Sequence, residues 1–452
     1  MGNDDQWNNG APELYMGYGT GGLATFNHDE GSVYVTRHVY IGYETGSSAT
    51  YDLQDGWLET GCYDARSTDG DLYVGRKGSG TLTQSGGYIF LDPPAGTKEG
   101  RLHVGGDGGD NTVNGVGVYN LSGGTCEVRS AVHIGSGGTG TVTQTGGRLK
   151  VLSGEYKHRM SIGQKNGKGV YNLYGGTLDL VRYGGYSLGL HVAGGWPDGN
   201  AIGELNIGNA SGAGSLVETT AGDGMYLLVR QFDTDRATVR GWSDDGANRF
   251  QLTGILYNSG RIIADGYGTQ RSLNLSTMSS VTNSSGVSDN TSSNGWFAQD
   301  KGKLILPGIS VSEGNTYNWG EASDDASIDM VNSARITFNQ LSAGPTTLTG
   351  SLLATDRSDV PAGPVSLISV HEFSLSGGAT SSDFDITIRY DDAAAGTEEA
   401  DLKLFHYAGG KWVDTEATLN AGNNWITATN LASFSQFGVG FDQAGGTMFK
   451  IR

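Results

Sequence analysis

The chain has 452 residues, including 76 glycines and eight prolines, and its formal net charge is −19. This length exceeds one ordinary compact domain but suits a repeat region joined to one small domain. The acidity disfavours binding to nucleic acid or an anionic membrane, both of which need a basic surface; no persistent Gly-X-Y triplet supports collagen, and no run of about 18 apolar residues predicts a transmembrane segment.

A four-residue pattern of apolar, variable, apolar and glycine residues recurs at intervals of about 30 residues. Its copies begin at Leu14, Val39, Leu72, Leu102, Val132 and Met160, with a degraded copy at Leu190. In the middle copies a second apolar stretch follows and ends in paired glycines, as in Thr81–Gly87, and a third follows the glycines, as in Tyr88–Leu91. Three short strands per unit predict one coil of a parallel β-helix, because stacking at about 4.8 Å buries an apolar stripe that one coil cannot bury alone.

The alternation of side chains along each strand predicts which residues face the core. Leu72, Leu102, Val132 and Met160 are expected to form one inward row. The residues that follow these positions should form one exposed outward row, and they are Tyr15, Tyr40, Tyr73, His103, His133, Ser161 and His191. In the second strand the pattern leaves two alternatives, since a one-residue slip exchanges the faces. The inward residues are either Leu82, Tyr119, Val142 and Tyr171 or Thr83, Asn120, Thr143 and Asn172.

The two cysteines, Cys62 and Cys126, lie two coils apart in this alignment. That separation is roughly 10 Å, which a disulfide cannot span. We therefore predict that both are small core residues with free thiols.

The repeat decays after about residue 200, and the character of the chain changes again near residue 344. Residues 384–390, 402–407 and 425–429 alternate cleanly between turns, which is typical of antiparallel strands. The predicted fold class is therefore all-β: a right-handed parallel β-helix over residues 1–343, with regular coils to about 200 and larger irregular ones after, followed by a small antiparallel β-sandwich over 344–452.

The repeat of the type Gly80–Gly87 resembles the β-strand repeats of bacterial surface proteins of the autotransporter-passenger or PEP-CTERM-anchored kind. The segments 294–333 and 390–437 share this resemblance, which covers most of the chain. It implies export and an extracellular or cell-surface location, not a particular chemistry. Because the N-terminus lacks an apolar signal region, we expect that an export signal has been removed ahead of Met1. The chain also departs from the family pattern in lacking a C-terminal sorting helix.

The sharpest cluster of reactive side chains is Tyr156, Lys157, His158 and Arg159, at a predicted corner just before a first strand. A polysaccharide lyase needs a cation to neutralise a uronate and a base to remove the α-proton. If the protein is an enzyme, Arg159 is the candidate neutraliser, and Tyr156, Lys157 or His158 is the candidate base. A solvated charged loop is the competing interpretation.

A glycoside hydrolase would instead need two facing carboxylates, and Glu127 and Asp179 are expected to be exposed about 10 Å apart with Lys150 between them. Cross-strand charge pairing is the favoured interpretation of that row. Calcium is weakly supported at residues 105–111 and at 390–399, and neither a metal site nor any other cofactor is predicted.

The function predicted from the sequence is that of an exported surface or adhesive protein that binds polysaccharide along the β-helix face, with no nucleic-acid partner. The alternative is a secreted enzyme that degrades polysaccharide, either a lyase of anionic glycans or a glycoside hydrolase. The expected ligand contacts combine the outward row with basic corners, and they are Tyr73, Arg101, His103, Arg129, His133 and His191.

Overall fold

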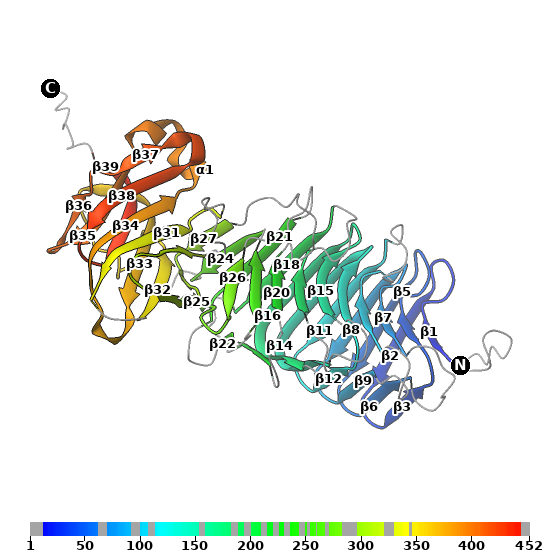
Figure 1. The fold of residues 1–452 in the computed structure, drawn as a ribbon. Coiled ribbons are helices and arrows are strands. Elements are labelled where there is room, and N and C mark those ends of the chain that lie inside the picture. The colour runs from blue at the N-terminus through cyan, green and yellow to red at the C-terminus, as the bar shows by residue number, and fades with distance from the viewer. Residues whose placement is uncertain are drawn as a thin grey trace. The chain divides into compact units, whose positions relative to one another are not determined.

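The computed structural model describes residues 12–61, 70–91, 100–106, 114–152, 159–181, 189–193, 200–208, 215–219, 226–229, 236–243, 249–250, 254–258, 260–266, 271–282, 296–320, 330–342 and 346–443. These residues form an all-β protein with long parallel sheets (Figure 1). The chain divides into two compact units: residues 1–260 with 284–293, and residues 261–283 with 294–452. This division lies earlier in the chain than the boundary at 344 that the sequence suggested.

The first strands of the repeats pair with one another in parallel, and each repeat adds one strand. They are β1 (Leu14–Met16), β4 (Val39–Ile41), β7 (Leu72–Val74), β10 (Leu102–Val104), β13 (Val132–Ser136), β15 (Arg159–Gln164), β17 (Gly189–Val192), β20 (Tyr226–Val229) and β23 (Ile255–Asn258). Leu72, Leu102, Val132 and Met160 are register partners in sequence and are all fully buried. The predicted inward row is confirmed.

The second strands form another parallel stack in the same unit. They are β2 (Leu23–His28), β5 (Ser48–Leu53), β8 (Ser79–Gln84), β11 (Val116–Leu121), β14 (Thr139–Leu152), β16 (Lys168–Val181), β18 (Ile202–Ile207) and β21 (Arg236–Gly241). Leu82, Tyr119, Val142 and Tyr171 are fully buried, which decides between the two alternatives that the sequence left open. Thr83, Asn120, Thr143 and Asn172 lie on the outer face instead.

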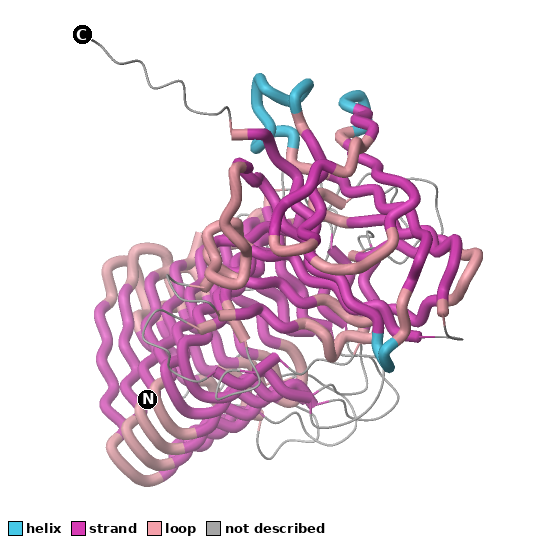
Figure 2. Tube along the Cα trace, turned by 90° about the vertical axis from the view of Figure 1, so that its left-hand side faces the viewer, coloured by secondary structure: helices cyan, strands magenta, loops and turns pink. Residues whose placement is uncertain are grey.

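The third strands complete each repeat after the paired glycines. They are β3 (Ser32–Val35), β6 (Trp57–Thr60), β9 (Tyr88–Leu91), β12 (Thr125–Val128), the second halves of β14 and β16, β19 (Ser215–Thr219) and β22 (Arg249–Phe250). Figure 2 shows the strands of the successive repeats lying side by side in layers. Cys126 is buried with a free thiol, as predicted, whereas Cys62 falls outside the described residues.

The glycine that recurs at the end of the first-strand pattern is favoured by its backbone conformation and by its neighbours. Gly105 has φ +76°, and a Cβ placed on it would lie 2.1 Å from the carbonyl oxygen of Thr139 in the next repeat. The degraded copy keeps a positive φ of 48° at Ala193. The recurring glycine therefore permits both the left-handed turn and the close approach of the next repeat.

The second unit begins with parallel pairs and continues as antiparallel sheets. β24 (Arg261–Asp265) pairs with β27 (Trp296–Asp300), and β25 (Ser272–Asn274) pairs with β28 (Lys303–Ile305). In sequence, β26 (Ser280–Thr282) lies between β25 and β27. One sheet then runs in the order β28, β32 (Thr346–Leu353), β33 (Val365–Leu375), β39 (Gln436–Asp442), β35 (Lys403–Ala408) and β36 (Lys411–Asp414), with β29 (Ile309–Val311) on β32.

The other antiparallel sheet of this unit has five strands. Its order is β30 (Thr316–Trp319), β31 (Ala334–Leu341), β34 (Ser381–Arg389), β38 (Trp425–Leu431) and β37 (Thr418–Asn420). Antiparallel pairing therefore starts before residue 344, so residues 309–341 do not continue the parallel repeat as the sequence suggested. The helical turns are η1 (Ser376–Gly378), α1 (Asp392–Ala395), η2 (Gly396–Asp401) and η3 (Ala421–Asn423).

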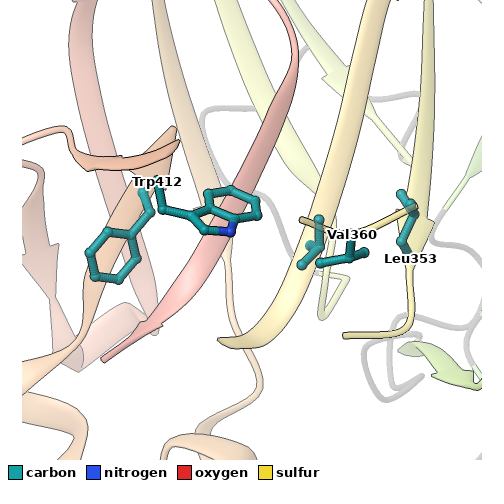
Figure 3. Close-up of a cluster of buried hydrophobic side chains, with 5 residues drawn as sticks. Leu353, Val360 and Trp412 are labelled. Carbon is teal, nitrogen blue, oxygen red and sulfur yellow. The ribbon is translucent and has the colours of Figure 1, made fainter. Parts of the chain in front are cut away.

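A cluster of buried apolar side chains holds part of this second unit together (Figure 3). Its members are Leu353, Val360, Val370, Phe405 and Trp412. The indole nitrogen of Trp412 donates a hydrogen bond of 2.8 Å to the carbonyl oxygen of Pro361, so the polar atom of this large side chain is satisfied. Within the described residues, no helix has the length and apolar character needed to cross a membrane.

Candidate functional site

The outward row of first-strand residues exists, and its aromatic rings are stacked. Tyr15, Tyr40, Tyr73, His103 and His133 are register partners from one repeat to the next. The ring centroids of Tyr40 and Tyr73 lie 4.9 Å apart, and those of Tyr73 and His103 lie 4.6 Å apart with an interplanar angle of 8°. Offset stacking of this kind contributes to stability beyond the area that the rings bury.

The predicted exposure of this row is wrong for most of its members. His103 is only 2% exposed, Tyr40, Ser161 and His191 are also buried, and Tyr73 and His133 are half-buried. Only Tyr15, at the first repeat, counts as exposed. Alternation along a strand predicts the side of the sheet that a residue takes, but it does not reveal what covers that side. The Arg76 guanidinium, for example, lies 5.3 Å from the ring centroid of Tyr40 and 5.7 Å from that of Tyr73.

Buried polar groups surround the middle of the row. Asp71 accepts hydrogen bonds from the Tyr73 hydroxyl and from the backbone N–H of Arg101, both at 2.9 Å, and its own backbone N–H donates to Nδ1 of His38 at 3.2 Å. Burial, and after it the nearby Arg37, Arg76 and Arg101, lowers the pKa of His38 to about 3. These bonds stabilise the corner between neighbouring repeats.

His103 lies at the same place, with Nε2 3.8 Å from Oδ2 of Asp71. Burial, and after it the proximity of His133, lowers the pKa of His103 well below its usual value. A neutral imidazole stacked on Tyr73 and in tilted contact with His133 is suited to packing, and its burial leaves it little access to a large ligand.

The predicted catalytic cluster is largely outside the described residues. Tyr156, Lys157 and His158 fall there, while Arg159 begins β15 and pairs in register with Gly189. The acidic end of the 105–111 fragment also falls outside. In the second acidic segment, the Asp391 carboxylate caps α1, and Glu399 accepts a hydrogen bond from the Tyr390 hydroxyl. Among the residues that the structure describes, no three or more His, Cys, Asp or Glu side chains are grouped to hold a metal ion.

A second candidate surface lies on the outer face of the third strands, and its first part is aromatic. We define the aromatic strip as Tyr34, Trp57, Tyr88 and Phe90. Trp57 and Tyr88 are register partners with ring centroids 4.5 Å apart and an interplanar angle of 22°, and Phe90 meets Trp57 edge to face. Tyr34 is 59% exposed and Trp57 is 37% exposed. Large apolar rings are seldom left this exposed in a group without a binding role.

The next repeats continue the same face with charged side chains. We define the charged strip as Glu127, Arg129, Arg148, Lys150 and Asp179. Glu127 is the register partner of Phe90 on one side and of Lys150 on the other, and Lys150 is in turn the partner of Asp179. The aromatic strip and the charged strip are therefore one continuous outer face.

Glu127 joins the two strips through its hydrogen bonds. Its Oε2 accepts from the Tyr88 hydroxyl at 2.8 Å and from Nζ of Lys150 at 3.1 Å, and its Oε1 accepts from Nε of Arg129 at 3.3 Å. Partial burial raises the pKa of Glu127, but the hydrogen bonds from Tyr88, Lys150 and Arg129 outweigh it, so the pKa is lowered. Glu127 is therefore held as a carboxylate.

The cations of this face are paired as the favoured sequence interpretation predicted. Lys150 bridges to Glu127, and the Arg148 guanidinium bonds the Asp179 carboxylate. The expected exposure of the two carboxylates is wrong, since Glu127 is 7% exposed and Asp179 is fully buried. The longer side chains of Arg129 and Lys150 lie over Glu127, and that of Arg148 lies over Asp179, because each forms a salt bridge with the carboxylate beneath it.

Of the predicted contact residues, Arg129 alone lies on this second surface. Its guanidinium lies 4.6 Å from the ring centroid of Phe90, and its side chain is 45% exposed. The sequence analysis did not single out Tyr34, Trp57, Tyr88 or Phe90. The signal was present, because alternation around the inward Ile89 and Leu91 places Tyr88 and Phe90 on the outer face.

Comparison with family models, with curated proteins and with solved structures found no match to this chain.

Proposed function

We propose that this chain is an exported bacterial surface protein whose repeat region is a right-handed parallel β-helix, followed by a small antiparallel β-sandwich, and that it binds polysaccharide on the outer face of its third strands. The parallel stacking of three strands per repeat supports the β-helix, and the two antiparallel sheets of the second unit support the sandwich. The resemblance to β-strand-repeat surface proteins supports export and an extracellular or cell-surface location.

The aromatic strip is the observation that carries the proposed binding function. Exposed Tyr and Trp side chains offer apolar rings for the C–H faces of sugars together with polar atoms for their hydroxyls. Tyr34 and Trp57 are both exposed, and the Trp57 indole N–H donates to Glu59 Oε2 at 3.0 Å, which holds a carboxylate beside the ring. The regular row of stacked repeats extends the same face over several strands, which suits a chain-like ligand.

The test is binding of the whole chain to a panel of soluble polysaccharides, measured by affinity electrophoresis. Trp57→Ala should weaken binding to the preferred polymer by about tenfold or more, as expected for removal of an aromatic anchor. The control is Tyr18→Ala, because Tyr18 is an aromatic residue more exposed than Trp57 that lies beside Tyr15 of the first-strand row. Equal binding by Trp57→Ala and the parent chain would reject this surface as the site.

A further inference from the structure

The outer face of the third strands is locally neutral around the charged strip, although the whole chain carries a formal charge of −19. Over the repeats from β6 to β16, the outer face presents the cations Arg129, Arg148 and Lys150 and the carboxylates Glu59, Glu127 and Asp179. Three positive and three negative groups balance. The surface therefore has no net charge with which to attract a charged polymer against the acidity of the rest of the chain.

Each cation of this strip is already bonded to a carboxylate of the protein. Lys150 and Arg129 bond the two oxygens of Glu127, and Arg148 bonds Asp179. A uronate or sulfate that took one of these cations would leave a nearly or fully buried carboxylate short of its partner. Because an uncompensated buried charge is strongly unfavourable, an anionic ligand gains little here.

Within the described residues, the Trp57 indole at the aromatic end of the face has a stacked ring on one side alone. Tyr88 lies against one side of the Trp57 indole, in the next repeat. The opposite side of the indole is turned toward the preceding repeat, where its register partner is Ser32, a small exposed residue. Tyr34 and Glu59 are register partners beside this position. An aromatic platform flanked by a hydroxyl and a carboxylate matches a neutral sugar ring and its hydroxyl groups.

We infer that the ligand of this surface is an uncharged, hydroxyl-rich polysaccharide, with one sugar ring on the Trp57 indole beside Tyr34 and Glu59. This inference rests on the proposed function and names its ligand class. It differs from the anionic glycan that the alternative function of a lyase would require.

The experiment compares two groups of polymers with the whole chain. The neutral probes are glucomannan, xyloglucan and mixed-linkage β-glucan, and the anionic probes are alginate, polygalacturonate and chondroitin sulfate. Binding is measured in low salt and at about 1 M NaCl, where the screening length is only ~3 Å. We expect at least one neutral polymer to bind, with an affinity that changes less than about twofold between the two salt concentrations, and we expect Trp57→Ala to weaken it by about tenfold or more.

The possible outcomes separate the inference from the proposed function. If only anionic polymers bind, and Trp57→Ala still weakens them, the surface is a glycan site but the ligand class inferred here is wrong. The same conclusion follows if binding of the neutral polymer falls more than about tenfold at high salt. If no polymer of either group binds, the proposed function and the inference both fail.

Discussion

The hydroxyl of Tyr119 donates a hydrogen bond of 2.5 Å to Oε1 of Gln84 in the preceding repeat, and both side chains are fully buried. The amide nitrogen of Gln84 donates in turn to the carbonyl oxygens of Gly87 and Thr125, at 3.3 and 3.1 Å. Two repeats later the same arrangement joins Tyr171 to Gln144, whose amide donates to Gly147 and Thr177. A buried hydrogen bond between tyrosine and glutamine therefore recurs after two repeats. Through the glutamine amide, it connects the second strand of a repeat to the paired glycines that follow that strand.

Replacing Tyr119 by Phe removes the donor to Gln84 while keeping the ring. The Gln84 carbonyl oxygen is then buried without that partner, so we expect the free energy of unfolding to fall by about 1–3 kcal/mol. The measurement is the urea midpoint followed by circular dichroism. Tyr18→Phe, at an exposed hydroxyl, should change the midpoint little.

The double variant Tyr119→Phe with Gln84→Leu tests whether the two residues act together. Leucine occupies the equivalent position in β11 and β16, as Leu121 and Leu173, so its size fits the stack. Because Gln84→Leu removes the unsatisfied oxygen, the double variant should lose less stability than the sum of the single variants, by about 0.5 kcal/mol or more. Strictly additive losses would contradict the link.

The glycine corners allow the cost of backbone conformation to be separated from the cost of crowding. Gly105 and Gly19 both have positive φ, of 76° and 83°, but a Cβ on Gly19 would meet nothing within 4 Å, whereas on Gly105 it would meet Thr139. Gly19→Ala should cost about 1–2 kcal/mol, the usual penalty of a left-handed residue. Gly105→Ala should cost clearly more, because the next repeat must also shift. Equal urea midpoints for the two variants would show that the close packing of repeats at this corner is not limiting.

The sequence predicted the inward rows well because they depend on local alternation, and Leu102 and Cys126 are buried as expected. It failed where coverage by other segments decides the outcome. His103 alternates outward like a surface residue, yet the rings of Tyr73 and His133 on either side and the nearby Asp71 bury it. The aromatic strip was missed because it depends on the register between β6 and β9, and the repeat spacing is least regular over the first three copies, from Leu14 to Leu72.

The buried His38 should make stability sensitive to acid. Its pKa is about 3 in the folded chain, mainly because of burial, and near 6.5 when unfolded. Its Nε2 lies 4.0 Å from Oε1 of Glu13, which favours the charged form, but burial and the three arginines outweigh that carboxylate. Between these two values the unfolded chain binds the additional proton. The free energy of unfolding is therefore unaffected by the titration of His38 above about pH 6.5. It decreases as the pH falls below that value, by at most about 1.4 kcal/mol per pH unit.

The measurement compares urea midpoints at neutral pH and near pH 4.5 for the parent chain and for His38→Gln. Glutamine keeps an acceptor for the backbone N–H of Asp71 but does not titrate. The variant should lose less stability on acidification than the parent chain. His103, whose pKa is also lowered by burial, should leave a residual acid sensitivity in both proteins. Identical pH dependence in the two chains would show that His38 is not a source of the effect.

Glu127→Gln changes the charge balance of the outer face while keeping the shape of the side chain. It leaves Lys150 and Arg129 beside a neutral amide, so the three cations of the charged strip face two carboxylates, Glu59 and Asp179. We expect unfolding stability to fall by about 1–3 kcal/mol, because hydrogen bonds to a charged group are replaced by weaker ones. We also expect weak binding of polygalacturonate to appear in low salt and to vanish at about 1 M NaCl. The control is Glu399→Gln, which also removes a carboxylate that accepts from a tyrosine, but in the second unit. If Glu127→Gln and Glu399→Gln gained the same affinity for polygalacturonate, the effect would come from net charge and not from this strip.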